Sequence, residues 1–169
     1  LNLDLGLDFN SELGTGLRIK NKRKTIGDYA LFASADWQIS EKLVLRPGVR
    51  YAYNTAYRAP IIPSFHAKYK INDIWTLRGS YGMGFRAPSL KELYFYFVDI
   101  NHNIRGNENL KAEKSNGFNV VGNMTKSVDA KTVYKLDIST FYNRIENLIS
   151  LAVLRGGDAN AFTYINIGR

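Results

Sequence analysis

Apolar and polar residues alternate one by one along most of this 169-residue chain, and no other feature limits its fold as strongly. The pattern is clearest in residues 1–9, where every odd position is apolar and every even position is polar or glycine. Successive side chains of a β-strand point to opposite faces, so a period of two predicts strands with one apolar and one polar face. The sequence therefore predicts an all-β fold.

Eight segments carry this alternation, and residues that favour turns separate them. The expected strands are residues 1–19, 29–39, 43–53, 61–71, 74–82, 112–123, 131–148 and 161–169. Short turns at 40–42, 72–73 and 125–130 alternate with longer connections, which include a basic tip at 20–24, a loop at 54–60 and a glycine-rich loop at 155–160. Short turns on one rim and long loops on the other are typical of bacterial outer-membrane barrels.

The composition fits a membrane barrel better than a membrane helix. The chain is 45% hydrophobic with eleven tyrosines, yet its mean hydropathy is only -0.25. No run approaches the roughly 18 apolar residues of a transmembrane helix. Aromatic residues near the strand ends fit the girdles of a membrane barrel; they are Tyr29, Trp37, Tyr53, Trp75, Tyr81 and Tyr142. The alternative is a soluble β-sandwich in which these rings pack in a core.

Several classes of function find no support in the residues. Without cysteine there are no disulfides and no thiolate metal sites. The net charge of +8 is scattered apart from residues 20–24 (KNKRK), which fit a loop tip touching lipopolysaccharide phosphates. No recognition helix or stacking module accompanies the charge, so nucleic acid is not an expected partner. Nothing places Ser89 or Ser115 beside His66 or His102, so no catalytic residues are assigned and no enzyme is predicted.

Two dense stretches bracket the longest connection. Residues 81–94 read YGMGFRAPSLKELY, and Gly82, Gly84 and Pro88 interrupt the alternation there, so we expect the strand to stop at Gly82. Residues 90–97 are expected to form a helical turn or two. Residues 106–115 read GNENLKAEKS, and the alternation resumes after them. A long connection between two strands is either functional or disordered.

These two stretches resemble the C-terminal barrel region of TonB-dependent outer-membrane receptors. Members carry a phrase like GFRAPSLxELY and then one like GNPxLKPExS, on either side of an extracellular loop. The first phrase is matched at Phe85, Arg86, Ala87, Pro88, Ser89, Leu90, Glu92, Leu93 and Tyr94, and the second at Gly106, Asn107, Leu110, Lys111, Glu113 and Ser115. Glu108 and Ala112 stand where the family usually has proline, so we expect a less rigid exit from the loop.

The resemblance implies an antiparallel up-and-down transmembrane β-barrel of 22 strands. Residues 1–169 would be a partial barrel domain of roughly eight strands, with the plug domain and the remaining strands absent. The implied protein is integral to the bacterial outer membrane, binds an iron complex, haem or cobalamin, and imports it with energy from the TonB complex. Its partners would be this metal-chelate cargo, membrane lipid and lipopolysaccharide, and TonB through the missing N-terminal region. A non-transporting structural or adhesive barrel and a soluble β-sandwich binding module remain alternatives.

The resemblance also suggests where cargo would bind. Some haem-transporting relatives carry an FRAP-like and an NPNL-like box with a histidine between them; here Phe85 to Pro88 and Asn107 to Leu110 form the boxes, and His102 lies between. A neutral imidazole can ligate haem iron, and aromatic rings can pack on a porphyrin. The candidate cargo-binding residues are His102, Tyr94, Tyr96, Phe97 and Arg105. Haem would be cargo; no cofactor and no metal within the apo chain are expected.

The alternative is that His102 is an exposed turn residue and that the aromatic residues only pad the loop. Arg86 and Glu92 are predicted to hold the loop's structure by ion pairs or backbone hydrogen bonds. Four basic residues on the polar strand faces are expected to line the lumen and to pair with acidic groups of the plug or of neighbouring strands; they are Arg46, Arg50, Lys68 and Arg78.

Overall fold

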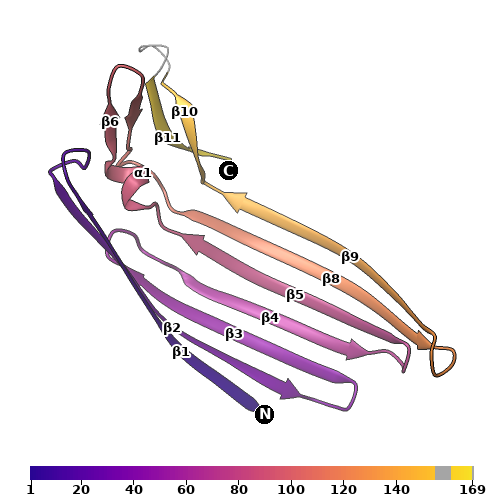
Figure 1. Cartoon of the computed structure of the whole chain (residues 1–169). Helices are drawn as coiled ribbons and strands as arrows, with labels where there is room; N and C mark the ends of the chain where they lie inside the picture. The colour runs from indigo at the N-terminus through magenta and orange to yellow at the C-terminus, as the bar shows by residue number, and fades with distance from the viewer. Residues whose placement is uncertain (155–160, 169) are drawn as a thin grey trace.

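The computed structural model, which describes residues 1–154 and 161–168, is a curved wall of long strands with a small second sheet at one rim (Figure 1). The wall is an antiparallel sheet of seven strands in the order β1-β2-β3-β4-β5-β8-β9. Its strands are β1 (Asn2–Thr15), β2 (Arg23–Gln38), β3 (Leu43–Asn54), β4 (Ile61–Lys70), β5 (Trp75–Arg86), β8 (Glu113–Ser127) and β9 (Val133–Glu146). Each strand of the wall pairs with the wall strand that comes next in the sequence. The predicted up-and-down all-β architecture is therefore confirmed.

Short turns join the strands at one rim, and side chains close them. Asn72 Oδ1 accepts the N–H groups of Ile74 and Trp75 at 2.9 and 2.8 Å, and Asp129 does the same for the turn before β9. Asparagine and aspartate favour such turns because their side chains replace a backbone acceptor. The opposite rim carries the long connections (Figure 1). The predicted glycine-rich loop at 155–160 lies outside the described residues.

The two faces of the wall differ as the alternation predicts. Leu5 pairs with Ala33 and Leu7 with Leu31 on one face, and the side chains of Leu5 and Leu7 are 69% and 64% exposed. The other face is polar and carries ion pairs across strands. Arg46 donates to Asp4 at 2.7 Å and lies 3.4 Å from Asp36, and Arg50 donates to Asp8 at 2.8 Å. These arginines pair with neighbouring strands, as the sequence suggested.

Aromatic side chains form two bands on the apolar face. Toward the loop rim, Tyr29 lies between Phe9 and Tyr53, with ring centroids 6.1 and 6.4 Å away. Trp37 and Trp75 stand near the short turns at the other rim. Tyr53 is 61% exposed and Trp37 54%, so these rings do not pack in a core, as a soluble β-sandwich would require.

Some predicted strand ends are wrong. The strand expected to stop at Gly82 continues as β5 to Arg86, because it pairs residue by residue with β8 until Arg86 meets Glu113. The first strand ends at Thr15, not at residue 19, because Gly16 adopts a φ of 117°. The strand expected over 131–148 ends at Glu146; Asn147, with a φ of 55°, separates it from β10 (Leu148–Val153).

A second sheet and one helix occupy the loop rim (Figure 1). The helix α1 (Leu90–Tyr94) falls within the predicted helical turns. The sheet has the order β10-β11-β7-β6 and includes β6 (Tyr96–Val98), β7 (Asn103–Arg105) and β11 (Ala161–Ile167). The parallel pairing of β11 with β7 joins the segment that follows β9 to the connection between β5 and β8. The sequence did not predict β6, β7 or this pairing.

Within residues 1–154 and 161–168, no helix has the length and apolar character needed to cross a membrane.

Candidate functional site

The connection between β5 and β8 begins with a helix that its own sequence caps. Ser89 is the N-cap: its hydroxyl accepts the Glu92 N–H, and the Glu92 carboxylate accepts the Ser89 N–H at 2.7 Å. This reciprocal capping is the expected behaviour of serine followed three residues later by glutamate. Pro88, just before the cap, is fully buried and cannot extend the ladder of β5. Within this motif, strand β5 therefore ends at Arg86 and helix α1 begins at Leu90.

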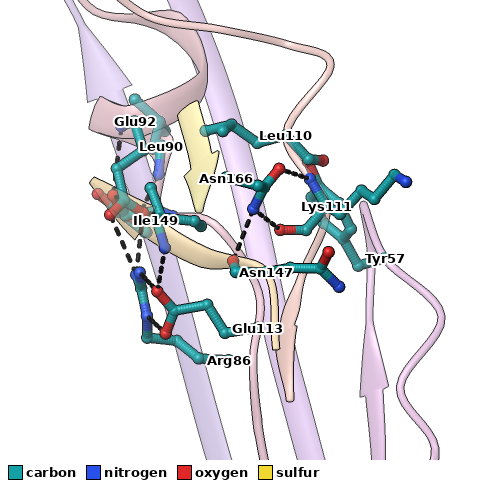
Figure 2. A network of polar contacts seen from close by, with 12 residues as sticks. Tyr57, Arg86, Leu90, Glu92, Leu110, Lys111, Glu113, Asn147, Ile149 and Asn166 are labelled. Atoms are coloured by element: carbon teal, nitrogen blue, oxygen red, sulfur yellow. Dashed lines mark hydrogen bonds and ion pairs between the residues drawn. The ribbon is translucent and has the colours of Figure 1, made fainter. Parts of the chain in front are cut away.

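Arg86 fastens the helix to both ends of the connection (Figure 2). Its guanidinium donates to Glu113 at 2.7 and 2.6 Å, in a bidentate pair, and to Glu92 at 2.9 Å. Both carboxylates are largely buried, with side chains 13% and 15% exposed. Glu113 also accepts the N–H of Ile149 in β10 at 2.7 Å. The prediction that Arg86 and Glu92 hold the loop's structure is confirmed.

The surroundings of Glu92 keep it ionised. Burial alone would raise its pKa, but the Arg86 guanidinium and the Ser89 amide and hydroxyl outweigh burial and hold the pKa of Glu92 below its usual range. A buried carboxylate with a positive partner and several donors is stabilised in its charged form. At neutral pH, Glu92 is therefore ionised, and its negative charge stabilises the contacts with Arg86 and Ser89.

An apolar cluster seats the helix on the polar face of the wall. Leu90, Leu93 and Leu110 are each 3% exposed and pack with Ile26 of β2. Leu90 also lies against Gly14 of β1, where a Cβ would come within 2.4 Å of it. The connection leaves the wall at β5 and crosses to β1 and β2. It thus extends over the polar, lumen-side face at the mouth of the barrel.

The second motif phrase packs on the first. Gly106 lies so close to the helix that a Cβ there would be 2.6 Å from the Leu93 carbonyl carbon and oxygen. The Asn107 N–H donates to the Glu92 carbonyl at 2.8 Å, and the Tyr57 hydroxyl donates to the Leu110 carbonyl at 2.9 Å. The two boxes matched in the sequence are therefore one packed unit.

The hairpin of β10 and β11 is fastened to the same unit (Figure 2). Asn166 accepts the Lys111 N–H at 2.8 Å and donates to the Lys111 carbonyl at 2.9 Å, so its amide completes a strand-like pairing. It also donates to the Asn147 carbonyl at 2.7 Å, beside the break between β9 and β10. Asn107 donates to the Tyr164 carbonyl at 2.8 Å. Nothing in the sequence signalled these contacts, because they join residues about 20 to 60 positions apart.

A groove of about 720 Å³ opens between this unit and the tip that joins β1 to β2. Three of the predicted cargo-binding residues line it, namely Tyr94, Tyr96 and Arg105, together with Asn107 of the second box. The other wall includes Leu17, Lys20 and Lys22. Lys20 is paired with Glu108, the residue that replaces a family proline. The groove is therefore both basic and aromatic.

The basic tip is the part of the groove that sequence reasoning missed. The expected contact of residues 20–24 with lipopolysaccharide stays a prediction; the structure places Lys20 and Lys22 in the groove and the Lys24 ammonium 4.5 Å from the centre of the Tyr94 ring. Asn21 and Lys22 both have positive φ values, which turns the tip back toward the loop. The sequence shows the run of basic residues at 20–24, but the side of the loop to which they point depends on this turn.

His102 and Phe97 lie apart from the groove, at the end of the β6–β7 hairpin. The His102 ring stacks on Phe97 with centroids 4.8 Å apart, and its Nδ1 is 3.0 Å from an Asp99 oxygen. The Asn101 amide and then the His102 ring and amide hold the pKa of Asp99 below its usual range. The Arg18 guanidinium lies 3.9 Å from the centre of the Phe97 ring. The predicted cargo residues thus divide into a groove set and a hairpin-tip set.

No three His, Cys, Asp or Glu side chains converge as a metal site in the part of the chain that the structure describes.

Comparison with known proteins gives one consistent result. Residues 2–169 match the family described as TonB dependent receptor-like, beta-barrel. The iron-regulated outer membrane virulence protein of Vibrio cholerae is 30% identical over 89 residues, which is 52% of this chain and 14% of that protein. The chain thus spans about a seventh of the length of this curated relative.

Solved structures match nearly the whole chain. The siderophore receptor PirA of Pseudomonas aeruginosa superimposes with a TM-score of 0.76 at 19% identity, covering 97% of this chain and 30% of the receptor. The hemophore receptor HasR of Serratia marcescens, solved with its hemophore HasA and heme, gives a TM-score of 0.81 at 16% identity over 97% of this chain and 34% of HasR. At these identities the likeness shows the fold alone.

Proposed function

This chain belongs to the TonB-dependent receptors of the bacterial outer membrane, and on that premise we propose that the intact protein captures an iron chelate from outside the cell and imports it with energy from TonB. Iron is the favoured cargo because the curated relative is named as iron-regulated and one of the similar structures is a siderophore receptor. The proposal goes beyond membership of the family, which fixes the barrel but not the cargo.

The groove at the loop rim is the observation that carries this proposal. Lys22 and Arg105 supply positive charge there, and Tyr94 and Tyr96 supply aromatic surface. A ferric tricatecholate carries net negative charge around an octahedral iron and exposes the planar faces of its catechol rings. Cations and aromatic rings together suit such a ligand, because each recognises a different part of it. The groove volume of about 720 Å³ lies within the range of small-molecule sites.

The Arg86 network explains how the groove keeps its shape. It fixes α1, which precedes Tyr94 and Tyr96, and it fixes β10, which belongs to the sheet that also holds β7 and Arg105. A preorganised site loses less conformational entropy on binding than a mobile loop. In this proposal the motif residues position the walls of the groove, and the lysines, arginine and tyrosines contact the cargo.

The test is a fluorescence titration of the full-length receptor in detergent. An anionic ferric tricatecholate, haemin and cobalamin are added separately, and the quenching of intrinsic fluorescence gives each Kd. We expect saturable binding of the ferric chelate, and a Kd at least about tenfold higher in Arg105→Ala, since a charge-assisted hydrogen bond contributes about 1.5–3 kcal/mol. Arg144→Ala is the matched control, because Arg144 lies on β9 outside the groove. Failure of all three ligands to bind would overturn the proposal.

Haem is a second candidate cargo, and His102 is the observation that favours it. Its Nδ1 faces Asp99, an arrangement that fixes a histidine ring so that the other nitrogen can ligate a metal. Phe97, stacked on His102, would help to hold the orientation of the imidazole ring. The discriminating experiment titrates haemin into the full-length receptor and follows the Soret band in wild type and His102→Ala. A Soret shift lost in the variant supports haem ligation by His102, whereas no shift, or one unchanged by the substitution, overturns it.

A further inference from the structure

The groove at the loop rim holds a carboxylate among its positive charges. Three cations line it, Lys20, Lys22 and Arg105. Glu108 is the only Asp or Glu among its lining residues in the part of the chain that the structure describes. The Glu108 carboxylate pairs with the Lys20 ammonium, which comes from the opposite wall and lies 88 residues away in the sequence. Among the described residues, Lys22 and Arg105 form no ion pair, so Lys20 is the groove cation that a carboxylate already holds.

The tip between β1 and β2 does not depend on this ion pair for its position. The Lys20 N–H donates to the Tyr94 carbonyl at 3.0 Å, and the Tyr96 N–H donates to the Arg18 carbonyl at 2.8 Å. These bonds fix the backbone of the tip against the segment that follows α1. The side chains of Lys20 and Glu108 are 61% and 44% exposed, and exposed ion pairs contribute little to stability because water competes for both charges. The Lys20 ammonium can therefore change its partner while the tip stays in place.

Each member of the pair favours the charged form of the other. The hydrogen bond from Lys20 holds the pKa of Glu108 below its usual range, and the same bond raises the pKa of Lys20. At neutral pH the carboxylate is therefore negative and repels a second anion that approaches Lys20. An anionic ligand gains a charge-assisted hydrogen bond from Lys20 only when the Glu108 carboxylate has released the ammonium.

We infer that Glu108 is a specificity-determining residue of the groove, whose carboxylate occupies Lys20 until an anionic group of the cargo displaces it. The inference rests on the proposed function, because it concerns the same groove and the same anionic iron chelate. A ligand group with a full negative charge can replace the carboxylate, whereas a neutral hydroxyl or carbonyl gains less from an ammonium. The pair thus favours charged chelates over neutral ones. The proline that the resembling family usually has at this position could not supply such a carboxylate.

Binding of ferric tricatecholate to the full-length receptor in detergent tests this competition. The Kd is measured for wild type, Glu108→Gln, Lys20→Gln and the double variant. An exposed ion pair changes an equilibrium constant by up to about fivefold, so we expect Glu108→Gln to lower the Kd about twofold to fivefold. The gain should be at least about twofold smaller in the Lys20→Gln background, where only repulsion by the carboxylate is removed. Glu146→Gln is the matched control, because it removes a carboxylate from an exposed ion pair outside the groove.

A second measurement follows the Lys20 amine without cargo. An N-hydroxysuccinimide ester acylates the unprotonated amine, so the rate of acylation rises when the pKa of the amine falls. Because Glu108 raises the pKa of Lys20, Glu108→Gln should speed the acylation of Lys20. Lys42, in the short turn at the other rim, is the internal reference and should react at the same rate in both proteins. An equal rate for Lys20 in the two proteins would overturn the inference.

The sign of the change in Kd separates this role from a structural one. If Glu108 only held the two walls of the groove together, Glu108→Gln would raise the Kd. A raised or unchanged Kd, or an equal gain in the Lys20→Gln background, therefore overturns the inference. Iron uptake by cells is measured separately. The expected changes in Kd without uptake would refute the proposed transport alone, uptake by a receptor whose Kd does not respond to Glu108→Gln would refute this inference alone, and no binding in any of the four proteins would refute both.

Discussion

At the scale of single residues, Arg86 has the largest structural effect. It joins the end of β5 to the start of β8 and to the helix, and through Glu113 it also holds the start of strand β10. The sequence predicted its structural role, because the motif places an arginine and a glutamate of opposite charge a short distance apart, at Arg86 and Glu92. It could not predict the Ile149 contact, since Ile149 follows Glu113 by 36 residues and no local pattern connects them.

Arg86→Ala should release the loop while leaving the wall folded. The substitution removes the positive partner of two largely buried carboxylates, those of Glu92 and Glu113. We therefore expect the free energy of opening α1 and β10 to fall by about 1–3 kcal/mol. Hydrogen exchange of the full-length receptor checks this: residues 89–95 and 148–153 should exchange faster, while β2 to β4 should be unchanged. Arg144→Ala, which removes an exposed pair with Glu146, is the control and should change little. Equal loosening of the wall strands would contradict this local role.

The charge on Glu92 predicts how the loop responds to acid. Its folded pKa lies below the usual value, so it contributes stability at pH values above about 4.3 and loses it as the pH falls through the lower folded pKa. We expect protection of α1 against hydrogen exchange, corrected for intrinsic rates, to be constant near neutral pH and to fall below about pH 4. Glu92→Gln should start with less protection and show a weaker pH dependence. Protection that increased on acidification would refute the assignment.

At the scale of elements, strand interiors were predictable and ends were not. The alternation placed the wall strands correctly because each has one apolar and one polar face. It failed at Gly82 and Gly84, since glycine has low strand propensity but the ladder between β5 and β8 continues through both positions. The second sheet was missed because β6 and β7 are three residues each and depend on the pairing with β11.

Two glycines of this region should respond oppositely to the same substitution. Gly106→Ala places a Cβ 2.6 Å from the backbone of Leu93, so we expect a loss of about 1–3 kcal/mol in the stability of the loop unit. Gly79→Ala in β5 has nothing within 4 Å and should be neutral or stabilising by up to about 1 kcal/mol. Hydrogen exchange of α1 and thermal unfolding of the receptor measure the two effects. Equal behaviour of the variants would show that the close approach at Gly106 does not matter.

At the scale of the molecule, the seven-stranded wall and the packed connection between β5 and β8, here called the loop unit, have different roles. The wall presents an apolar face to lipid and a polar face to the lumen, as the composition and alternation predicted. The loop unit extends from β5 to β1 and β2 and forms one side of a basic, aromatic groove. The sequence supplied the groove's tyrosines and arginine as candidates. It did not show that the basic tip lines the groove, because the direction of a loop depends on contacts between segments far apart in the chain.

The most direct test of the proposed function is uptake of radiolabelled iron by cells that express the full-length receptor. The label is supplied as the ferric tricatecholate, and matched cells lack either the receptor or TonB. We predict accumulation that needs both proteins, that saturates with chelate concentration, and that Arg105→Ala reduces while Arg144→Ala does not. Accumulation equal in cells with and without the receptor would contradict the account and favour a non-transporting barrel.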